Sequence, residues 1–471
     1  MLIGREEEIY QLEEAYSSSE SEFVAIYGRR RIGKTYLVRE TLQNRFSFFH
    51  AGVSKLPAKG QLVAFYNSLV NHGYTPSRIP KNWLEAFQYL LTFIKDKKEN
   101  KKVIFLDELP WMDTPKSDFL PAFEHFWNGW ASARKDILLI VCGSATSWII
   151  KNIVNNHGGL HNRLSRSIKL KQFTLRECEK YVASVRMQMT RPQIIEAYMI
   201  FGGVPYYWSK LDHRFSLAQN IDRMFFTENA ILKNEFEDLY ASLFKHPDPY
   251  LKIISVLGKK KVGMTIEEIS ESTKLFRNGS LTKYLGDLEA CGFIRSYSSY
   301  GNRVKGTVYQ LIDNYTLFYY RFLSSKKNTD EGYWSKIQTS AVFSNWCGLS
   351  FERICLLHIR QIKNALGIGG ILSNEFSWRT PPYADLPGVE IDLLIERADK
   401  VFNLCEMKYT KNPFIIDKKY AANLQNKIAR LRDVTKTRNA IFLTMIAASG
   451  LTLNEYAGDI QNIITADALF D

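Results

Sequence analysis

The chain has 471 residues, of which 45% are apolar and 24% charged, with a formal net charge of +13. This length predicts roughly two to four domains, and the apolar fraction excludes a largely disordered chain. The basic balance fits either an ordinary solvated surface or an anionic partner such as nucleic acid.

The six cysteines are scattered along the chain and form no CxxC or Cys/His cluster. This pattern argues against a zinc site and favours reduced cysteines in the core. No run of about 18 apolar residues occurs, so we expect no membrane span. The opening MLIGREEEIY lacks the pattern of a signal peptide, and we expect a cytoplasmic protein.

The stretch YGRRRIGKTYLV, residues 27–38, fits the phosphate-binding pattern G-x-x-x-x-G-K-S/T. An apolar strand at 22–28 precedes it and a helical pattern at 34–43 follows it, which is the context that a P-loop needs. Successive backbone N–H groups and the helix N-terminus then face the phosphates of ATP. The predicted ATP-binding residues of this loop are Gly28, Arg29, Arg30, Arg31, Ile32, Gly33, Lys34 and Thr35, with Thr35 also a ligand of Mg²⁺.

A buried strand at 103–106 is followed by Asp107 and Glu108. Ligands of open α/β sheets bind at this carboxyl end of the strands. We predict that Asp107 holds Mg²⁺ with Thr35 and that Glu108 polarises the attacking water. An acidic helix cap is the alternative interpretation.

The next apolar strand, DILLIVCGSAT at 136–146, ends in Ser144, which is placed to sense the γ-phosphate or to orient water; a simple strand-end turn is the alternative. Arg163 and Arg166 follow, and either could stabilise phosphate charge from the same chain or from a neighbour in a homo-oligomer. A solvated loop residue is the alternative for each arginine.

These segments together resemble the AAA+ ATPases, in particular the archaeal-type ATPase family. The resemblance rests on IGREEEIYQLEE, YGRRRIGKT, IFLDELPWM, CGSAT, NRLSR and, at 201–208, FGGVPYYW. It implies that Gly4 and Arg5 lie near the adenine and that a small helical lid follows. His161-Asn162-Arg163 lacks the glycine that usually precedes the family's arginine.

From residue 249 the pattern predicts three helices, at 249–258, 265–274 and 278–294, followed by a two-stranded ribbon at 294–311. This order is typical of a winged helix-turn-helix, whose third helix can enter a DNA major groove. Residues 251–330 hold 13 Lys/Arg and 7 Asp/Glu, nearly half of the net charge. A docking or regulatory module is the alternative. The predicted DNA contacts are Asn278, Ser280, Thr282, Lys283, Arg303 and Lys305.

Near the C-terminus, VEIDLLIE, the turn RADK and VFNLCEMKY predict a β-hairpin. Glu406 and Lys408 are two residues apart and leave the same strand face, and Asp392 can lie beside them on the partner strand. Carboxylates in this arrangement can bind Mg²⁺ or Mn²⁺ and activate water, with Lys408 orienting it. A charged ladder on a solvent face is the alternative.

This hairpin resembles the PD-(D/E)xK restriction-endonuclease-like nucleases. The resemblance assigns Asp392, Glu406 and Lys408 to catalysis and adds Glu352, on the preceding helix, to the metal ligands Asp392 and Glu406. A helix at 419–431 would bring Gln425 or Lys427 near the site.

The predicted fold is therefore a multidomain α/β protein. It comprises an AAA+ P-loop core at 1–190, a helical lid at 191–245, a winged helix at 246–335 and a nuclease-like domain at 336–471. We expect ATP to gate a DNA-directed, metal-dependent nuclease. The alternative is a nucleotide-dependent switch or scaffold whose C-terminal domain does not cut.

Overall fold

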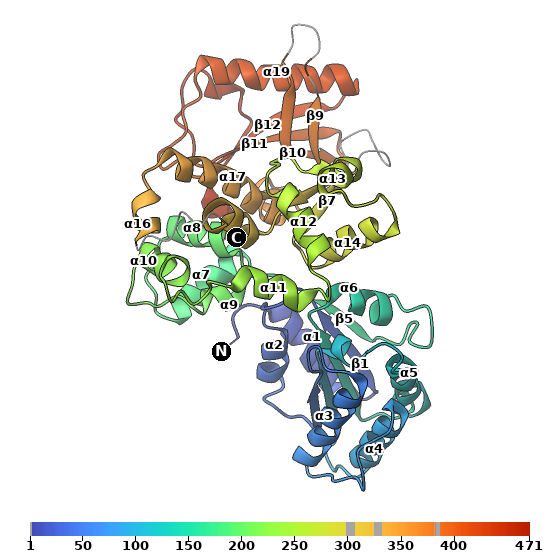
Figure 1. The fold of residues 1–471 in the computed structure, drawn as a ribbon. Coiled ribbons are helices and arrows are strands. Elements are labelled where there is room, and N and C mark those ends of the chain that lie inside the picture. Colours follow the sequence, from blue (N-terminus) through green and yellow to red (C-terminus); the bar gives the residue numbers. More distant parts are fainter. Residues whose placement is uncertain (1, 298–306, 325–331, 381, 383–386) are drawn as a thin grey trace.

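The computed structural model describes residues 2–297, 307–324, 332–380, 382 and 387–471. Figure 1 shows an N-terminal unit at one end of the molecule and a C-terminal unit at the other, with a middle unit between them. None of the described helices is long and apolar enough to cross a membrane.

The N-terminal unit, residues 2–173, is built on a five-stranded parallel sheet in the order β2-β3-β4-β1-β5. Strands β1, β3 and β4 are buried along their whole length, as continuous apolar runs of a parallel sheet should be. Helices cover both faces. The elements are α1 Glu6–Ser17, β1 Glu22–Tyr27, α2 Lys34–Thr41, β2 Phe48–Ala51, α3 Ala58–Asn71, α4 Trp83–Lys95, β3 Lys102–Asp107, α5 Phe119–Gly129, β4 Ile137–Gly143, α6 Thr146–Ile149 and β5 Arg166–Lys169.

A helical segment, residues 174–244, follows the sheet. Its helices are α7 Leu175–Ser184, α8 Arg191–Phe201, α9 Pro205–Trp208, α10 Leu217–Ile221 and α11 Glu235–Leu243. A turn at 227–234 precedes α11. Helix α8 ends at Gly202, whose φ of 58° lies in the left-handed region.

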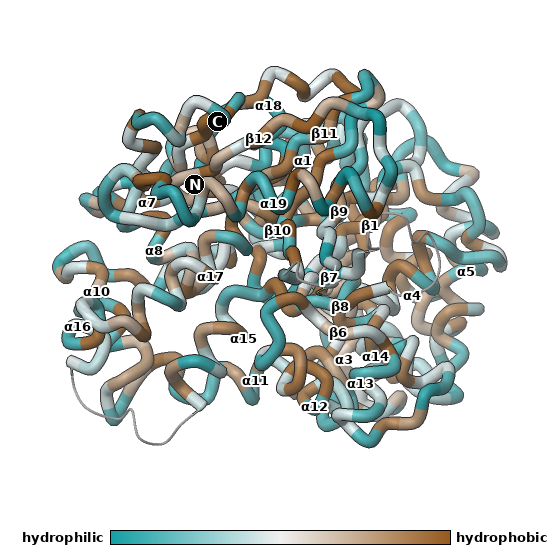
Figure 2. Tube along the Cα trace, turned by 90° about the horizontal axis from the view of Figure 1, so that it is seen from above, coloured by the Kyte–Doolittle hydropathy of each residue, from teal (hydrophilic) through white to brown (hydrophobic). Residues whose placement is uncertain are grey.

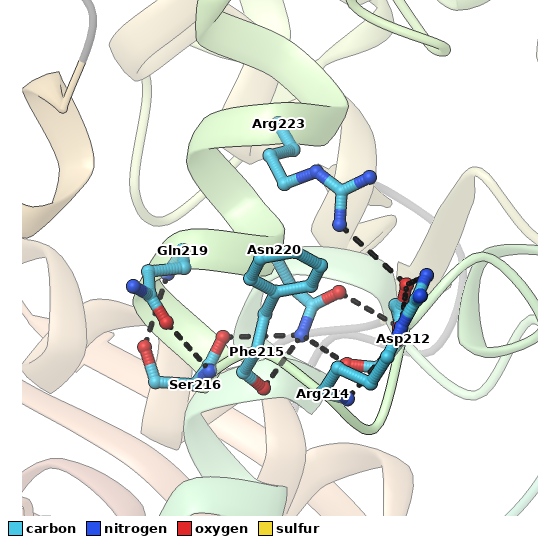
Figure 3. A network of polar contacts seen from close by, with 7 residues as sticks. All are labelled: Asp212, Arg214, Phe215, Ser216, Gln219, Asn220 and Arg223. Carbon is cyan, nitrogen blue, oxygen red and sulfur yellow. Dashed lines mark hydrogen bonds and ion pairs between the residues drawn. The ribbon is translucent and has the colours of Figure 1, made fainter.

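A polar network fixes the turn between α9 and α10 (Figure 3). The amide of Asn220 donates to the carbonyls of Asp212, Phe215 and Ser216, and its oxygen accepts from the Asp212 N–H at 2.8 Å. Arg223 lies 3.6 Å from the Asp212 carboxylate. These bonds tie the loop before α10 to the side chain of Asn220 within that helix.

The middle unit, residues 247–324, has the predicted order of three helices and a ribbon. Its elements are α12 Asp248–Leu257, β6 Met264–Thr265, α13 Ile266–Thr273, α14 Gly279–Ala290, β7 Ile294–Tyr297, β8 Val308–Leu311 and α15 Asn314–Phe318, with the sheet order β6-β8-β7. A capping box of Thr265 and Glu268 opens α13. Arg303 and Lys305 lie outside the described residues.

The C-terminal unit, residues 332–471, has a mixed sheet in the order β13-β12-β11-β10-β9. Its elements are α16 Tyr333–Ile337, α17 Ala341–Leu357, α18 Ile359–Ala365, β9 Ser373–Thr380, β10 Val389–Arg397, β11 Val401–Lys408, α19 Lys418–Thr435, β12 Ala440–Ala447 and β13 Asn462–Ile464. The predicted hairpin is β10 and β11, which pair antiparallel, whereas β11 and β12 pair parallel. Helices α17 and α19 cover opposite faces of this sheet (Figure 1).

The packing of the cores joins three of these parts. Two apolar cores flank the N-terminal sheet. A third core is one continuous cluster of packed side chains, drawn from residues between Phe173 and Phe470. It includes the helical segment, the middle unit and one face of the C-terminal sheet. Figure 2 shows β1 as largely hydrophobic and teal stretches along peripheral helices such as α5 and α7. All six cysteines are buried, as predicted.

Candidate functional site

The P-loop joins β1 to α2 at the carboxyl edge of the parallel sheet. Gly28, Arg31 and Gly33 have φ values of 146°, 71° and 87°. A side chain at Gly28 would meet the Leu170 carbonyl at 2.3 Å, so that position needs glycine for space as well as for conformation. The loop wraps back on itself and leads directly into the first turn of α2.

The two reactive side chains of the loop point to the sheet edge. Lys34 is buried, and its Nζ donates to the carbonyls of Gly28 and Arg29 at 3.0 and 2.9 Å. The Thr35 hydroxyl donates to Asp107 Oδ2 at 2.7 Å. Thr35 and Asp107, predicted from separate motifs, therefore form one pair of hard oxygen donors, the ligand type that fits Mg²⁺.

Glu108 is positioned by an unusual backbone and by Ser144. Its φ of 47° is left-handed, which turns the chain sharply after β3. Glu108 Oε2 accepts from the Ser144 hydroxyl at 2.9 Å and from the Ser144 N–H at 3.2 Å. The structure thus brings together two predicted residues from the ends of neighbouring strands, β3 and β4.

Two arginine side chains of the loop face away from the phosphate position. Arg29 is buried in an ion pair with Asp313, the residue that caps α15. Arg31 forms an ion pair with Glu235 at the start of α11 and lies over the Tyr206 ring at 4.3 Å. These partners could not be predicted from the sequence. Arg29 and Arg31 attach the loop to the middle unit and the helical segment, which leaves Lys34 and the backbone N–H groups as the candidate phosphate contacts.

A cavity of about 490 Å³ opens beside the P-loop. It is mostly apolar, is lined by the aromatic rings of Tyr36, Tyr181 and Tyr206, and includes Ile32 and Gly33 of the loop. Arg5 also lines it, donates to the Lys171 carbonyl at 2.6 Å and lies over Phe173. Such a pocket can hold a flat heterocycle next to bound phosphates.

The two arginines predicted near the transferred phosphate lie elsewhere in this chain. Arg166 pairs with Glu14 and Glu22 at the start of β1, at the opposite edge of the sheet from the P-loop. Arg163 is two residues from Ser165, which bonds the Phe23 carbonyl at that same edge. A six-residue strand spans roughly 16–20 Å. Arg166 is therefore a structural ion-pair residue, while the role predicted for Arg163 stays a prediction.

In the C-terminal unit the predicted acidic residues come together at the start of β10 and the end of β11. Leu393 pairs with Cys405, and continuing this register by one residue sets Asp392 opposite Glu406. Glu352 on α17 lies close enough to Asp392 that burial and the Asp392 charge raise the pKa of its carboxyl to about 7. These carboxylates are buried or half-buried and do not form a solvent-facing ladder.

A lysine that the sequence did not single out lies within this cluster. Lys261, from the loop between α12 and β6, approaches Glu352 Oε2 at 3.1 Å and Asp392 Oδ1 at 3.6 Å. Burial lowers the pKa of Lys261, but the charges of Asp392 and Glu352 outweigh it, and the net shift is upward.

Glu406 has partners of its own on α19. It forms an ion pair with Lys427 and accepts a hydrogen bond from the Tyr420 hydroxyl at 3.0 Å. Lys427 was one of two predicted helix residues near the site, and this prediction is confirmed. The other, Gln425, instead donates to Asp459 at 2.8 Å.

Lys408 leaves the same face of β11 as Glu406, but its ammonium lies 4.9 Å from the Tyr420 ring centre and 6.0 Å from that of Phe414. In this arrangement Lys427, not Lys408, contacts Glu406. Within the described ranges, no three His, Cys, Asp or Glu side chains stand ready to hold a metal ion. The oxygen donors suit Mg²⁺ or Mn²⁺, but lysine charges now neutralise them.

The third helix of the middle unit, α14, is partly free. Ser280, Thr282 and Lys283 are exposed, and Lys283 lies 3.8 Å from Asp287. Asn278 caps the helix by accepting from the N–H groups of Ser280 and Leu281. Phe276, just before the helix, is 84% exposed. The other end of α14 packs near α6 of the N-terminal unit (Figure 1).

Comparison with known families identifies the N-terminal part of the chain. A family model described as an ATPase domain predominantly from Archaea matches residues 2–211. An uncharacterized protein of Methanocaldococcus jannaschii is 25% identical over 357 residues, which cover 75% of this chain and 76% of that protein. An uncharacterized ATP-binding protein of the same organism is 38% identical over 45 residues, 10% of this chain and 76% of that protein.

Solved structures show a more distant likeness. The Walker-type ATPase of Pyrococcus abyssi has a TM-score of 0.46 and 15% identity, covering 67% of this chain and 95% of that chain. The ORC2 protein of Aeropyrum pernix has a TM-score of 0.41 and 13% identity, covering 72% of this chain and 96% of that chain. At this level of similarity they carry no conclusion about activity.

Proposed function

Residues 2–211 belong to the ATPase domain family found predominantly in Archaea, and from this premise we propose that the chain binds and hydrolyses ATP to control a DNA-directed C-terminal unit. The observation that carries the ATPase proposal is the convergence of Lys34, Thr35, Asp107 and Glu108 on one edge of the sheet. These groups come from two separate segments, the start of α2 and the end of β3, so their meeting is not a property of the loop motif alone.

Each side chain has a distinct role in this proposal. Lys34 exchanges its bonds to loop carbonyls for phosphate oxygens. Thr35 and Asp107 hold Mg²⁺, which supplies charge neutralisation at the phosphates when bound. Glu108 accepts a hydrogen bond from the attacking water, and Ser144 fixes the carboxylate that does so.

The apolar cavity beside the loop is the proposed adenine site. Tyr36, Tyr181 and Tyr206 provide aromatic faces for the base, and Arg5 closes one side. The nucleotide would then contact both the P-loop and α9, which carries Tyr206. Because Arg31 links the same loop to α11, ATP is placed to change how the helical segment sits on the sheet.

We extend the proposal to DNA through the middle and C-terminal units. The order of elements in 248–311 matches a winged helix, and α14 offers Thr282 and Lys283 to a duplex. The order α17, β9, β10, β11, α19, β12 with Asp392 opposite Glu406 supports a nuclease-like unit of the PD-(D/E)xK type. The proposed chemistry is metal-dependent phosphodiester cleavage.

A non-cutting switch or scaffold is the second candidate. It is favoured by the pairing of Glu406 with Lys427 and by the position of the Lys408 ammonium over the Tyr420 ring. In that case ATP would still change the arrangement of the units, and the C-terminal unit would bind a partner without cutting it.

Incubation of the full chain with plasmid DNA and Mg²⁺ or Mn²⁺, with and without ATP, separates the two candidates. Metal-dependent cutting that is lost in Glu406→Ala supports the nuclease. Glu375→Ala is the matched control, because Glu375 also lies on the C-terminal sheet but pairs only with Lys363 at 3.2 Å on the surface. If no variant cuts under any condition while ATP hydrolysis is intact, the scaffold stands and the nuclease is rejected.

A further inference from the structure

The loop of residues 258–263 delivers a charged side chain from the middle unit into the C-terminal unit. Three consecutive lysines, Lys259, Lys260 and Lys261, follow α12, and all three are exposed, Lys261 with 38% of its side chain accessible. Within the described residues, Lys259 and Lys260 form no ion pair. Lys261 alone among the three lies within ion-pair distance of carboxylates, those of Glu352 and Asp392.

The two carboxylates need a cation at this place. Glu352 and Asp392 lie side by side and half-buried or deeper, so their like charges repel in a medium that screens them poorly. The Lys261 ammonium lies between them and compensates both. A divalent cation would satisfy the same two oxygen donors, and it cannot share that position with an ammonium group.

The main chain around Lys261 is clamped from both sides. Its carbonyl accepts from Gln310 Nε2 of β8 at 2.7 Å and from Arg353 Nη2 of α17 at 2.5 Å. The Tyr297 hydroxyl of β7 donates to the carbonyl of Val262. The main chain at Lys261 is therefore held by its own unit and by the C-terminal unit together, which fixes the point from which the side chain reaches the carboxylates.

The strand that holds this loop also leads to the P-loop. Gln310 lies on β8, and Asp313, three residues further on, pairs with Arg29 of the P-loop. A rearrangement that separates Arg29 from Asp313 would move the end of β8 and with it the clamp on Lys261. The structure provides a continuous set of contacts for such coupling.

We propose that Lys261 is a built-in cation that closes the C-terminal carboxylate site, and that divalent metal binding requires the middle unit to withdraw it. This inference rests on the proposed function, in which those carboxylates bind a divalent metal. In the arrangement described above, the carboxylate site is closed to metal, and Lys261 is an inhibitory residue, not a catalytic one.

The test is Mn²⁺ binding to the full chain, measured by calorimetry without nucleotide or DNA. Lys261→Met keeps the length of the side chain and removes its charge, and it should bind Mn²⁺ at least tenfold more tightly than the unmodified protein. Lys260→Met, the neighbouring exposed lysine, should match the unmodified protein, and Lys261→Arg should remain closed. Adding Asp392→Asn to Lys261→Met should abolish the tight site, which assigns it to these carboxylates and not to the P-loop.

A second readout follows the movement itself. Mn²⁺ added to the unmodified protein should speed amide hydrogen exchange in residues 258–263 and in the start of β10, because the clamp must open. In Lys261→Met the same exchange should be fast before metal is added.

Equal or weaker Mn²⁺ affinity in Lys261→Met overturns the closure. If the unmodified protein cuts DNA and Lys261→Met does not, Lys261 contributes to the reaction instead. The failure of the proposed function looks different: Lys261→Met then binds Mn²⁺ tightly and neither protein cuts DNA, which keeps the closure and rejects only the nuclease. DNA cutting by both proteins with equal Mn²⁺ affinity rejects only the closure.

Discussion

Arg29 of the P-loop and Asp313 at the start of α15 form a buried ion pair across 284 positions of the sequence. Both side chains are more than nine-tenths buried. Asp313 also caps α15 by accepting from the N–H and hydroxyl of Thr316. The pair connects the nucleotide loop directly to the end of the ribbon in the middle unit.

Removing one member of this pair should cost far more than removing both. Asp313→Asn keeps a side chain that can cap α15 but leaves the Arg29 charge buried without its partner, so we expect a loss of about 3–5 kcal/mol in unfolding free energy. The double variant Arg29→Met with Asp313→Asn should recover much of that loss. Urea unfolding of the four proteins in this cycle measures the coupling, and additive losses would show that the pair contributes no coupling energy.

Lys34→Met should abolish useful ATP binding. The change removes the ammonium that faces the phosphates and leaves an apolar side chain of similar length in a buried position. We expect the Kd for ATP to rise at least a hundredfold, about 2.7 kcal/mol. Fluorescent-nucleotide titration measures it, with Lys59→Met on the exposed face of α3 as the control. Unchanged affinity would place the nucleotide somewhere other than the P-loop.

Tyr206→Ala tests the proposed adenine pocket. Loss of one aromatic face should weaken ATP binding by roughly 5- to 50-fold, because stacking on a base is worth about 1–2 kcal/mol. Binding of inorganic triphosphate, which has no base, should hardly change. Tyr10→Ala, an exposed tyrosine on α1, serves as the control. Equal losses for ATP and triphosphate would mean that Tyr206 acts through Arg31 and the loop, not through the base.

His358 should make stability depend on pH. It joins α17 to the N-terminus of α7, accepting from the Leu175 N–H at 3.1 Å and donating to the Ile354 carbonyl. Burial lowers the pKa of His358 to about 4, below its usual 6.5. The unfolded chain therefore takes up a proton that the folded chain does not, and stability falls as pH drops from 6.5 to 4, with no further change from this group below 4.

The matching experiment compares unfolding free energies of the unmodified protein and His358→Gln at pH 7 and pH 4. The drop between these two pH values should be smaller in His358→Gln by roughly 3 kcal/mol. His50, whose pKa burial lowers to about 3, titrates in both proteins and cancels in the comparison. An identical drop in both would remove His358 as the cause.

The sequence predicted those features whose signal is local. The P-loop follows from spacing within eight residues, and Asp107 and Glu108 follow from a buried strand that ends in acids. The β10–β11 hairpin follows from alternation and a turn, and its register then sets Asp392 opposite Glu406. The edge strand β9 was missed, because its alternation is weak and its outer residues are polar.

The partners across units could not be predicted, because they depend on how the units pack. Nothing in the local sequence distinguishes Lys261 from Lys259 and Lys260. The packing of α17 against the middle unit is what brings Lys261 to the carboxylate of Glu352. The same is true of Arg29 and Asp313. A long charged side chain such as Lys408 can also lie over a nearby aromatic ring, here that of Tyr420, which strand periodicity does not reveal.

The most direct test of the account is phosphate release from ATP by Glu108→Gln under saturating nucleotide. This variant keeps the size of the side chain and removes the charge that Ser144 holds at the sheet edge. If Glu108 activates the attacking water, we expect unchanged ATP affinity and a turnover rate lowered by about 10²- to 10⁴-fold. Turnover equal to that of the unmodified protein would contradict it, because Glu108 would then have no part in activating water.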